Sequence, residues 1–122
     1  MAVSESLVAL LKEQLEPLGG ITLKRMFSGA GVYCDGVIFG LILRDVLHFK
    51  VDDGNRASYE MEGMTPFSYE ARGKTVRMGA YWRVPERLLD EPEEMLAWAR
   101  AALAAGRRAT AGKKPARPRR DS

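Results

Sequence analysis

The chain has 122 residues, of which 46% are hydrophobic and 29% are charged, values that are ordinary for one globular domain. Its single cysteine, Cys34, excludes an internal disulfide. No apolar run approaches the roughly 20 residues of a membrane-spanning helix, and the N-terminus lacks the basic segment of a signal peptide. We therefore expect a cytoplasmic protein without membrane contact.

Charge is distributed unevenly along the chain. Residues 1–105 contain 12 Lys and Arg against 15 Asp and Glu, a net charge of −3, whereas residues 106–122 carry +6. A mildly acidic body argues against a broad nucleic-acid surface on the domain itself. The second segment has no large apolar residue to offset the entropy of ordering. We expect a folded domain over 1–105 and a disordered basic tail over 106–122.

The tail has two possible roles. One is to keep the protein soluble, and the other is to bind DNA without sequence preference. Nonspecific DNA contact is predicted for its basic residues: Arg107, Arg108, Lys113, Lys114, Arg117, Arg119 and Arg120.

The first half of the chain predicts a helix followed by an antiparallel meander. Apolar residues recur at helical spacing over 7–15, after the capping candidates Ser4 and Ser6. Asp35-Gly36 and Arg44-Asp45 are predicted two-residue turns between apolar runs. The strands that we expect cover residues 21–27, 30–34, 37–43 and 46–51.

The second half predicts a short helix, a hairpin and a longer helix. Asp90 and Glu93 have the spacing of a capping box, and Gly106 is expected to end the last helix. The elements are a helix from Asp52 or Asp53 to about Glu62, strands over 67–70 and 74–78 joined by a three-residue loop, an extended segment over 81–84, and a helix over 90–105. The fold class is two-layer α+β: an antiparallel sheet, made of a β-meander and a second hairpin, packed with about three helices.

Strand alternation predicts two apolar faces for the meander. Two-residue turns pair Cys34 with Val37 and Leu43 with Val46, and directly paired residues share a face. One face is uniformly apolar and should pack under the helices. The other is apolar at its centre, so we expect another helix, a protein partner or a second copy of the chain to cover it. The predicted interface residues are Val32, Val37, Phe39, Leu41, Val46 and His48.

Nothing in the sequence predicts a catalytic centre or a cofactor. Cys34 and His48 are the only thiol and imidazole, and the expected register separates their backbones by roughly 16 Å, too far for a nucleophile and its base. Gly29-Ala30-Gly31 leads into a strand, not into the helix that a phosphate loop needs. Metal ligands with suitable spacing are absent from the sequence. We expect a protein that is not an enzyme and that has no metal.

Basic and aromatic residues suggest one alternative function. Arg25, Tyr81 and Arg83 could line a cleft in which the arginines hold a small anionic ligand, although pairing with carboxylates of the body is the more common fate of such residues. Tyr69, Tyr81 and Trp82 are interleaved with basic residues, a pattern that can stack bases but is more often a sheet with one packed side.

Several segments together resemble the TfoX N-terminal domain family. They include residues 24–36, with Arg25-Met26-Phe27 before the glycines, the segments 37–42, 48–52 and 63–67, Tyr81-Trp82-Arg83-Val84-Pro85, and the helix around 96–100. The resemblance covers roughly residues 7–105 and implies a two-layer α+β fold without catalytic residues. It further implies a transcriptional co-regulator of competence-type genes. Ser28 stands where the family pattern leads us to expect glycine, and we expect the short basic tail in place of the second domain of full-length competence regulators.

Overall fold

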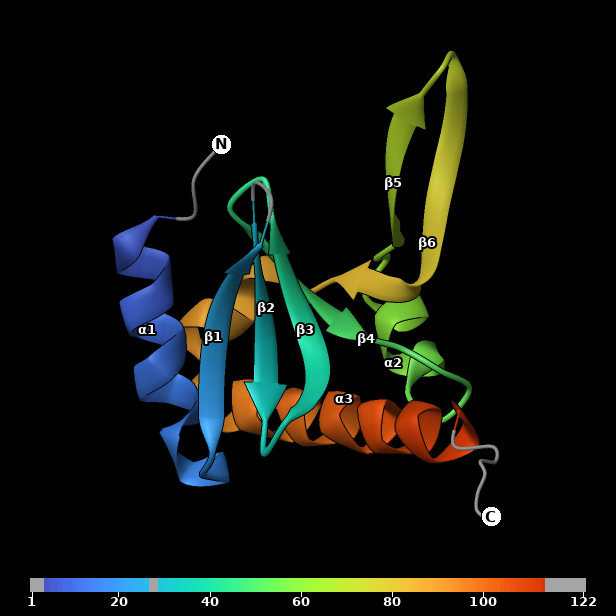
Figure 1. Ribbon diagram of the computed structural model, residues 1–122. Coiled ribbons are helices and arrows are strands. Elements are labelled where there is room, and N and C mark those ends of the chain that lie inside the picture. Colours follow the sequence, from blue (N-terminus) through green and yellow to red (C-terminus); the bar gives the residue numbers. More distant parts are fainter. Residues whose placement is uncertain (1–3, 27–28, 114–122) are drawn as a thin grey trace, which may run out of the picture.

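The fold is a six-stranded sheet with helices on one side, seen in a computed structural model that describes residues 4–26 and 29–113 (Figure 1). The helices and short 3-10 turns are α1 (Glu5–Leu15), η1 (Glu16–Leu18), α2 (Arg56–Met61), η2 (Glu86–Asp90) and α3 (Pro92–Lys113). The strands are β1 (Ile21–Met26), β2 (Gly29–Cys34), β3 (Val37–Leu43), β4 (Val46–Lys50), β5 (Pro66–Ala71) and β6 (Lys74–Arg83).

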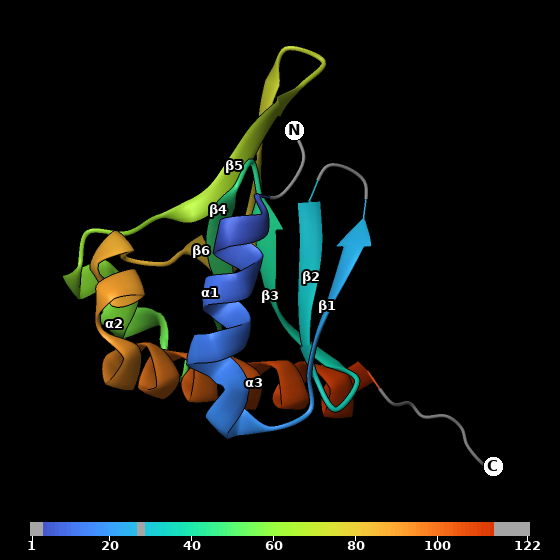
Figure 2. The ribbon, with the colours of Figure 1, turned by 90° about the vertical axis from the view of Figure 1, so that its left-hand side faces the viewer.

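The strand order is β1-β2-β3-β4-β6-β5, and every neighbouring pair is antiparallel. Figure 2 shows α1, α2 and α3 on the same side of the sheet, while the other side of β1 and β2 carries no helix. This arrangement confirms the two-layer α+β fold class. It also rules out a helix from the described residues as the cover for the second sheet face.

Two-residue turns connect the hairpins. Asp35-Gly36, Arg44-Asp45 and Arg72-Gly73 each have positive φ at both positions, the backbone of a type I′ turn whose twist matches that of the strands. The third turn corrects the predicted three-residue loop, because Ala71 pairs directly with Lys74. Arg44-Asp45 is the one among these turns without glycine, with φ of 54° and 61°.

The predicted N-terminal cap forms at α1 but not at α3. Ser4 caps α1 by accepting a hydrogen bond at Oγ from the Leu7 amide at 3.2 Å. The capping box expected at Asp90 and Glu93 does not form, because Asp90 ends η2 and α3 begins at Pro92. Proline suits this first helical position, since its missing N–H would have no partner there.

Gly106 does not end α3, which continues to Lys113. A Cβ at Gly106 would lie 2.6 Å from the Ile38 carbonyl oxygen of β3, so glycine permits a close helix–sheet approach at this point. The prediction of disorder from residue 106 is therefore wrong for residues 106–113. The remaining basic residues of the expected tail, Lys114, Arg117, Arg119 and Arg120, lie outside the described residues.

An ion pair fixes the end of α3 to the body. Arg108 donates from Nε and Nη2 to the two carboxylate oxygens of Asp52, at 2.7 and 2.8 Å. Arg108, expected to contact DNA, is therefore engaged with the protein itself. Arg107 is exposed on the same helix.

Acid is expected to loosen this end of α3. Hydrogen bonding from Arg108 lowers the pKa of Asp52 to about 2, below its value in the unfolded chain. The pair therefore stabilises the fold above pH ~4, and the stabilisation is lost as the pH falls toward 2. We expect the Tm of the wild-type protein to fall more steeply over that range than the Tm of Arg108→Gln. Parallel curves would show that the pair does not contribute to folding.

A β-bulge in β3 changes the predicted faces of the meander. Cys34 pairs with Val37 and Tyr33 with Ile38, but Val32 pairs with Gly40, so Phe39 is one extra residue in β3. The strict alternation expected from the sequence is therefore interrupted. The side chains from Val32 to Phe39 therefore exchange faces relative to the prediction, whereas those from Leu41 onward in β3 and β4 keep the predicted face.

The bulge divides the predicted interface between the two faces. Val32 and Phe39 are fully buried in the core under the helices, and Val37 packs against that core. The expectation that these three residues form an interface is wrong. Leu41, Val46 and His48 lie on the other side of the sheet.

Candidate functional site

The side of the sheet that faces away from the helices is the candidate site, and we call it the open face. Strand register places one row of side chains across it from Lys24 through Leu41 and His48 to Arg83. The flanking rows add Met26, Tyr33, Ile38, Leu43, Val46, Lys50 and Tyr81. None of these side chains belongs to the hydrophobic cluster that the described helices form with the sheet.

The centre of the open face is apolar and tightly packed. Leu41 and Tyr81 are 8% and 9% exposed although no helix covers them, so neighbouring strands and side chains exclude water there. Lysines lie over two tyrosine rings, with Lys24 Nζ 5.2 Å from the centroid of Tyr33 and Lys50 Nζ 5.1 Å from that of Tyr81. Such cation–π contacts keep positive charge next to the aromatic rings of this face.

The hairpin of β5 and β6 projects beyond the rest of the sheet (Figure 1). Pairing of Phe67 with Met78 and of Tyr69 with Val76 puts four apolar side chains on one side of the hairpin. We call these four residues the hairpin stripe. The other side carries Ser68, Glu70, Thr75 and Arg77. A two-stranded hairpin with an uncovered apolar side is marginal in water by itself, which is typical of a surface that binds a partner.

His48 and Phe67 join the hairpin stripe to the open face. The imidazole of His48 meets the Phe67 ring edge-on with centroids 5.0 Å apart, and Phe67 stacks on Tyr69 at 5.9 Å. Burial lowers the pKa of His48, so the ring is neutral at pH 7. Its Nδ1 lies 3.0 Å from the Val46 carbonyl oxygen, so in the neutral ring Nδ1–H is the donor.

Positive charge predominates in the strands of the sheet. Among the charged residues of the six strands only Glu70 is acidic, and six are basic: Lys24, Arg25, Lys50, Lys74, Arg77 and Arg83. The other acidic residues of 1–105 lie outside the strands, eight in helices and 3-10 turns and six in turns and loops. The net charge of −3 over residues 1–105 is thus the sum of a basic sheet and of acidic helices, turns and loops.

A cleft of about 220 Å³ opens at the base of the hairpin, and we call it the hairpin cleft. It lies between the β3–β4 turn, the start of β5 and the end of β6. Arg44 and Arg83 line it together with Val46, His48 and Phe67, and no acidic residue among the described ones does. The Arg44 guanidinium carbon lies 6.0 Å from the centroid of the Phe67 ring.

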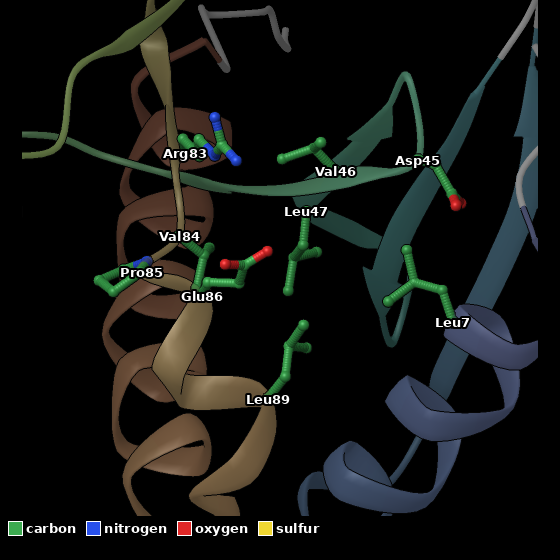
Figure 3. A pocket seen from close by; sticks show the side chains of 9 residues that line it. All are labelled: Leu7, Asp45, Val46, Leu47, Arg83, Val84, Pro85, Glu86 and Leu89. Carbon is green, nitrogen blue, oxygen red and sulfur yellow. The ribbon is translucent and has the colours of Figure 1, made fainter.

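A second pocket is too small for a substrate. Its volume is about 60 Å³, room for only a few water molecules, whereas that of the hairpin cleft is about 220 Å³. Figure 3 shows Leu7 of α1, Leu47 of β4 and Leu89 of η2 around it, with Arg83 at its rim. Asp45 and Glu86 also line this pocket, and the described residues around it include no histidine or cysteine.

The two reactive side chains do not meet. Cys34 lies on the helix-covered side of the sheet, where its Sγ donates to the Gly19 carbonyl oxygen at 3.1 Å, and His48 lies on the open face. Burial raises the pKa of Cys34, which keeps it a thiol and a poor nucleophile. No group of three His, Cys, Asp or Glu that could hold a metal occurs in residues 4–26 and 29–113.

The anion site expected from Arg25, Tyr81 and Arg83 is not assembled. Arg25 pairs with Ala30 on the helix-facing side of β1, whereas Arg83 is four strands away, about 19 Å, on the open face. Arg83 instead shares the hairpin cleft with Arg44, a residue that the sequence analysis treated only as part of a turn. The sequence around each arginine does not indicate that the two lie close together. They do so because β6 pairs with β4, the strand that follows the turn of Arg44.

Comparison with known proteins agrees with this fold. The family model for the TfoX N-terminal domain matches residues 13–106, more than half of the chain. No curated protein matched the sequence. No helix in the described parts of the chain is both long and apolar enough to cross a membrane. The matched domain is of a regulatory type and is not known to be catalytic. Because this family model covers residues 13–106 of the 122, the chain belongs to the TfoX N-terminal domain family.

Proposed function

We propose that the protein is a non-enzymatic regulatory module of competence-type genes, acting in the cytoplasm through contact with a protein partner. The observation that carries the proposal is the hairpin stripe, an apolar surface on an arm that extends away from the core. Tyr69 is 36% exposed although it is aromatic. Exposed aromatic residues on a projecting element are typical anchors for a partner surface.

The hairpin stripe can be tested without disturbing the core. The double variant Tyr69→Ser/Val76→Thr removes apolar surface from the stripe, and Ser68→Ala/Thr75→Ala changes the opposite side of the same hairpin as a control. We expect both variants to keep a Tm near that of the wild type, since these side chains lie outside the core. Only the stripe variant should lose control of competence-type genes, measured as their transcript levels in cells that lack the native gene.

Two outcomes distinguish the forms of this proposal. If the partner is a second copy of the chain, light scattering will show a dimer that the stripe variant disrupts. If the partner is another protein, the wild type will be monomeric and the stripe variant will still lose regulation. A stripe variant that regulates these genes like the wild type contradicts the proposal.

The basic residues at 114–120 are proposed to add nonspecific DNA affinity. Each phosphate neutralised contributes about 0.9 to the slope of log affinity against log salt on duplex DNA. Replacing Lys114, Arg117, Arg119 and Arg120 by glutamine in the full chain, the tail variant, should lower this slope by up to that amount per residue. An unchanged slope would remove these residues from DNA binding.

A further inference from the structure

We infer that the hairpin cleft is a binding site for a phosphate group, held between the guanidinium groups of Arg44 and Arg83. This inference goes beyond the proposed function, which assigns DNA affinity to the basic tail, because the site lies on the folded body. The ligand class is a phosphate monoester or diester. A free nucleotide and a single-stranded nucleic acid both carry this group.

The first argument is that these two arginines have no ion-pair partner in the described parts of the chain. Three of the ten described arginines, Arg56, Arg87 and Arg108, pair with carboxylates, and Arg44 and Arg83 are among the seven that do not. Arg44 and Arg83 form none of the ion pairs seen among the described residues, and both line a cleft in which these residues include no carboxylate. Arg83 also lines the second pocket beside Asp45 and Glu86, but it forms no ion pair with either of them.

The second argument concerns which anion fits two separate guanidinium groups. One arginine can already hold both oxygens of a carboxylate in a planar, bidentate contact. A phosphate monoester presents three terminal oxygens and up to two negative charges, and a diester presents two terminal oxygens and one charge in a tetrahedral arrangement, so either can engage two arginines that approach from different elements. Arg44 comes from the β3–β4 turn and Arg83 from the end of β6, on two sides of the cleft. Apolar walls from Val46 and Phe67 reduce the local dielectric and strengthen such contacts.

The third argument is that the backbone holds Arg44 in place. Its φ of 54° belongs to a tight turn, and the next residue, Asp45, accepts a hydrogen bond at Oδ1 from the Ser4 amide at 2.8 Å. The turn is thereby attached to the start of α1. A fixed backbone reduces the entropy lost when the side chain binds a ligand. The basic character of the strands adds a favourable field over the same face.

The fold offers a matched control for each arginine. Arg72 occupies the same position of a type I′ turn as Arg44, with φ of 55°, but it lies at the tip of the hairpin. Arg25 is an exposed strand arginine like Arg83, but it lies toward the helices. Arg44→Asn and Arg72→Asn therefore make the same change of charge and of turn residue. Arg83→Gln and Arg25→Gln likewise make the same change of charge in a strand. Asparagine tolerates the left-handed backbone, so the turn variants are expected to fold.

The experiment measures binding of full-length proteins to two probes. A labelled oligothymidylate is titrated by fluorescence anisotropy, and thymidine monophosphate is titrated by calorimetry, with sodium acetate as a carboxylate probe. We expect Arg44→Asn and Arg83→Gln each to weaken oligothymidylate binding about tenfold, the loss of one charge-assisted contact. Arg72→Asn and Arg25→Gln should change it less than twofold. When Arg44→Asn or Arg83→Gln is combined with the tail variant, oligothymidylate binding should still weaken relative to the tail variant alone.

Each outcome decides the inference. Loss of both phosphate probes in the cleft variants supports a site for the phosphate group itself, and loss of the oligonucleotide alone supports a site for a nucleic-acid strand. Equal losses in cleft and control variants would show only general electrostatic attraction and would overturn the inference. Acetate binding as tight as that of the nucleotide would overturn the choice of phosphate. If only the tail variant loses DNA, the cleft inference fails while the proposed role of the tail stands.

Discussion

Phe39→Ala is expected to destabilise the protein by about 3–5 kcal/mol, a large part of the total stability of a small domain. Phe39 is the extra residue of the β3 bulge, and its ring is fully buried 5.8 Å from the ring of Phe49. Truncation leaves a cavity between the sheet and α3 that the surrounding strands cannot collapse to fill. Urea unfolding followed by circular dichroism measures the loss in the free energy of unfolding.

The neighbouring residue supplies the control for this prediction. Ile38 lies on the open face, half-buried and outside the core cluster, so Ile38→Ala should cost well under half as much. Uninterrupted alternation would place Phe39 on the open face and Ile38 in the core, and it predicts the reverse order. A larger loss for Ile38→Ala than for Phe39→Ala would therefore contradict the bulge.

Gly106→Ala is expected to destabilise the protein by about 1–3 kcal/mol, the usual cost of overpacking, even though alanine forms helices better than glycine. At an exposed helical site the same change would stabilise by up to about 1 kcal/mol. Here the added methyl would meet the Ile38 carbonyl oxygen at 2.6 Å, so α3 must move away from β3. The shift would also strain the pair between Arg108 and Asp52.

Thr110→Ala tests the same helix at an exposed position. We expect it to leave the Tm unchanged or raise it slightly, because the side chain at 110 faces solvent. A disordered segment after residue 105 would make both substitutions neutral. Thermal unfolding of the two variants beside the wild type therefore decides whether residues 106–113 pack on the sheet as a helix.

Local chemistry was enough for most of the elements. Asp35-Gly36 and Arg44-Asp45 predicted tight turns, and the structure confirms the pairs Cys34–Val37 and Leu43–Val46 next to them. These features depend on residues close together in the chain, so their signal is present before folding. The same reasoning failed at Gly106, where glycine serves a contact with a strand nearly 70 residues earlier and not a helix end.

The candidate site was less accessible to prediction for a related reason. His48 and Leu41 were correctly expected on a face away from the main core, but Val32 and Phe39 were assigned to the same face because a bulge leaves no clear mark in the sequence. The net charge of residues 1–105 sums basic strands with acidic helices, turns and loops, so it does not reveal the basic sheet. The pairing of Arg44 with Arg83 in one cleft required knowledge of the strand order.

Residue patterns are sufficient to predict the fold class, the order of helices and strands, the family and the scarcity of reactive groups. Three features depend on the folded chain: which sheet face stays uncovered, how far α3 extends, and which arginines come together at the base of the hairpin. The physical reason is separation along the chain, because turns, caps and amphipathic periodicity depend on residues only a few positions apart. Faces, close approaches and clefts arise instead from contacts between segments that are distant in the chain.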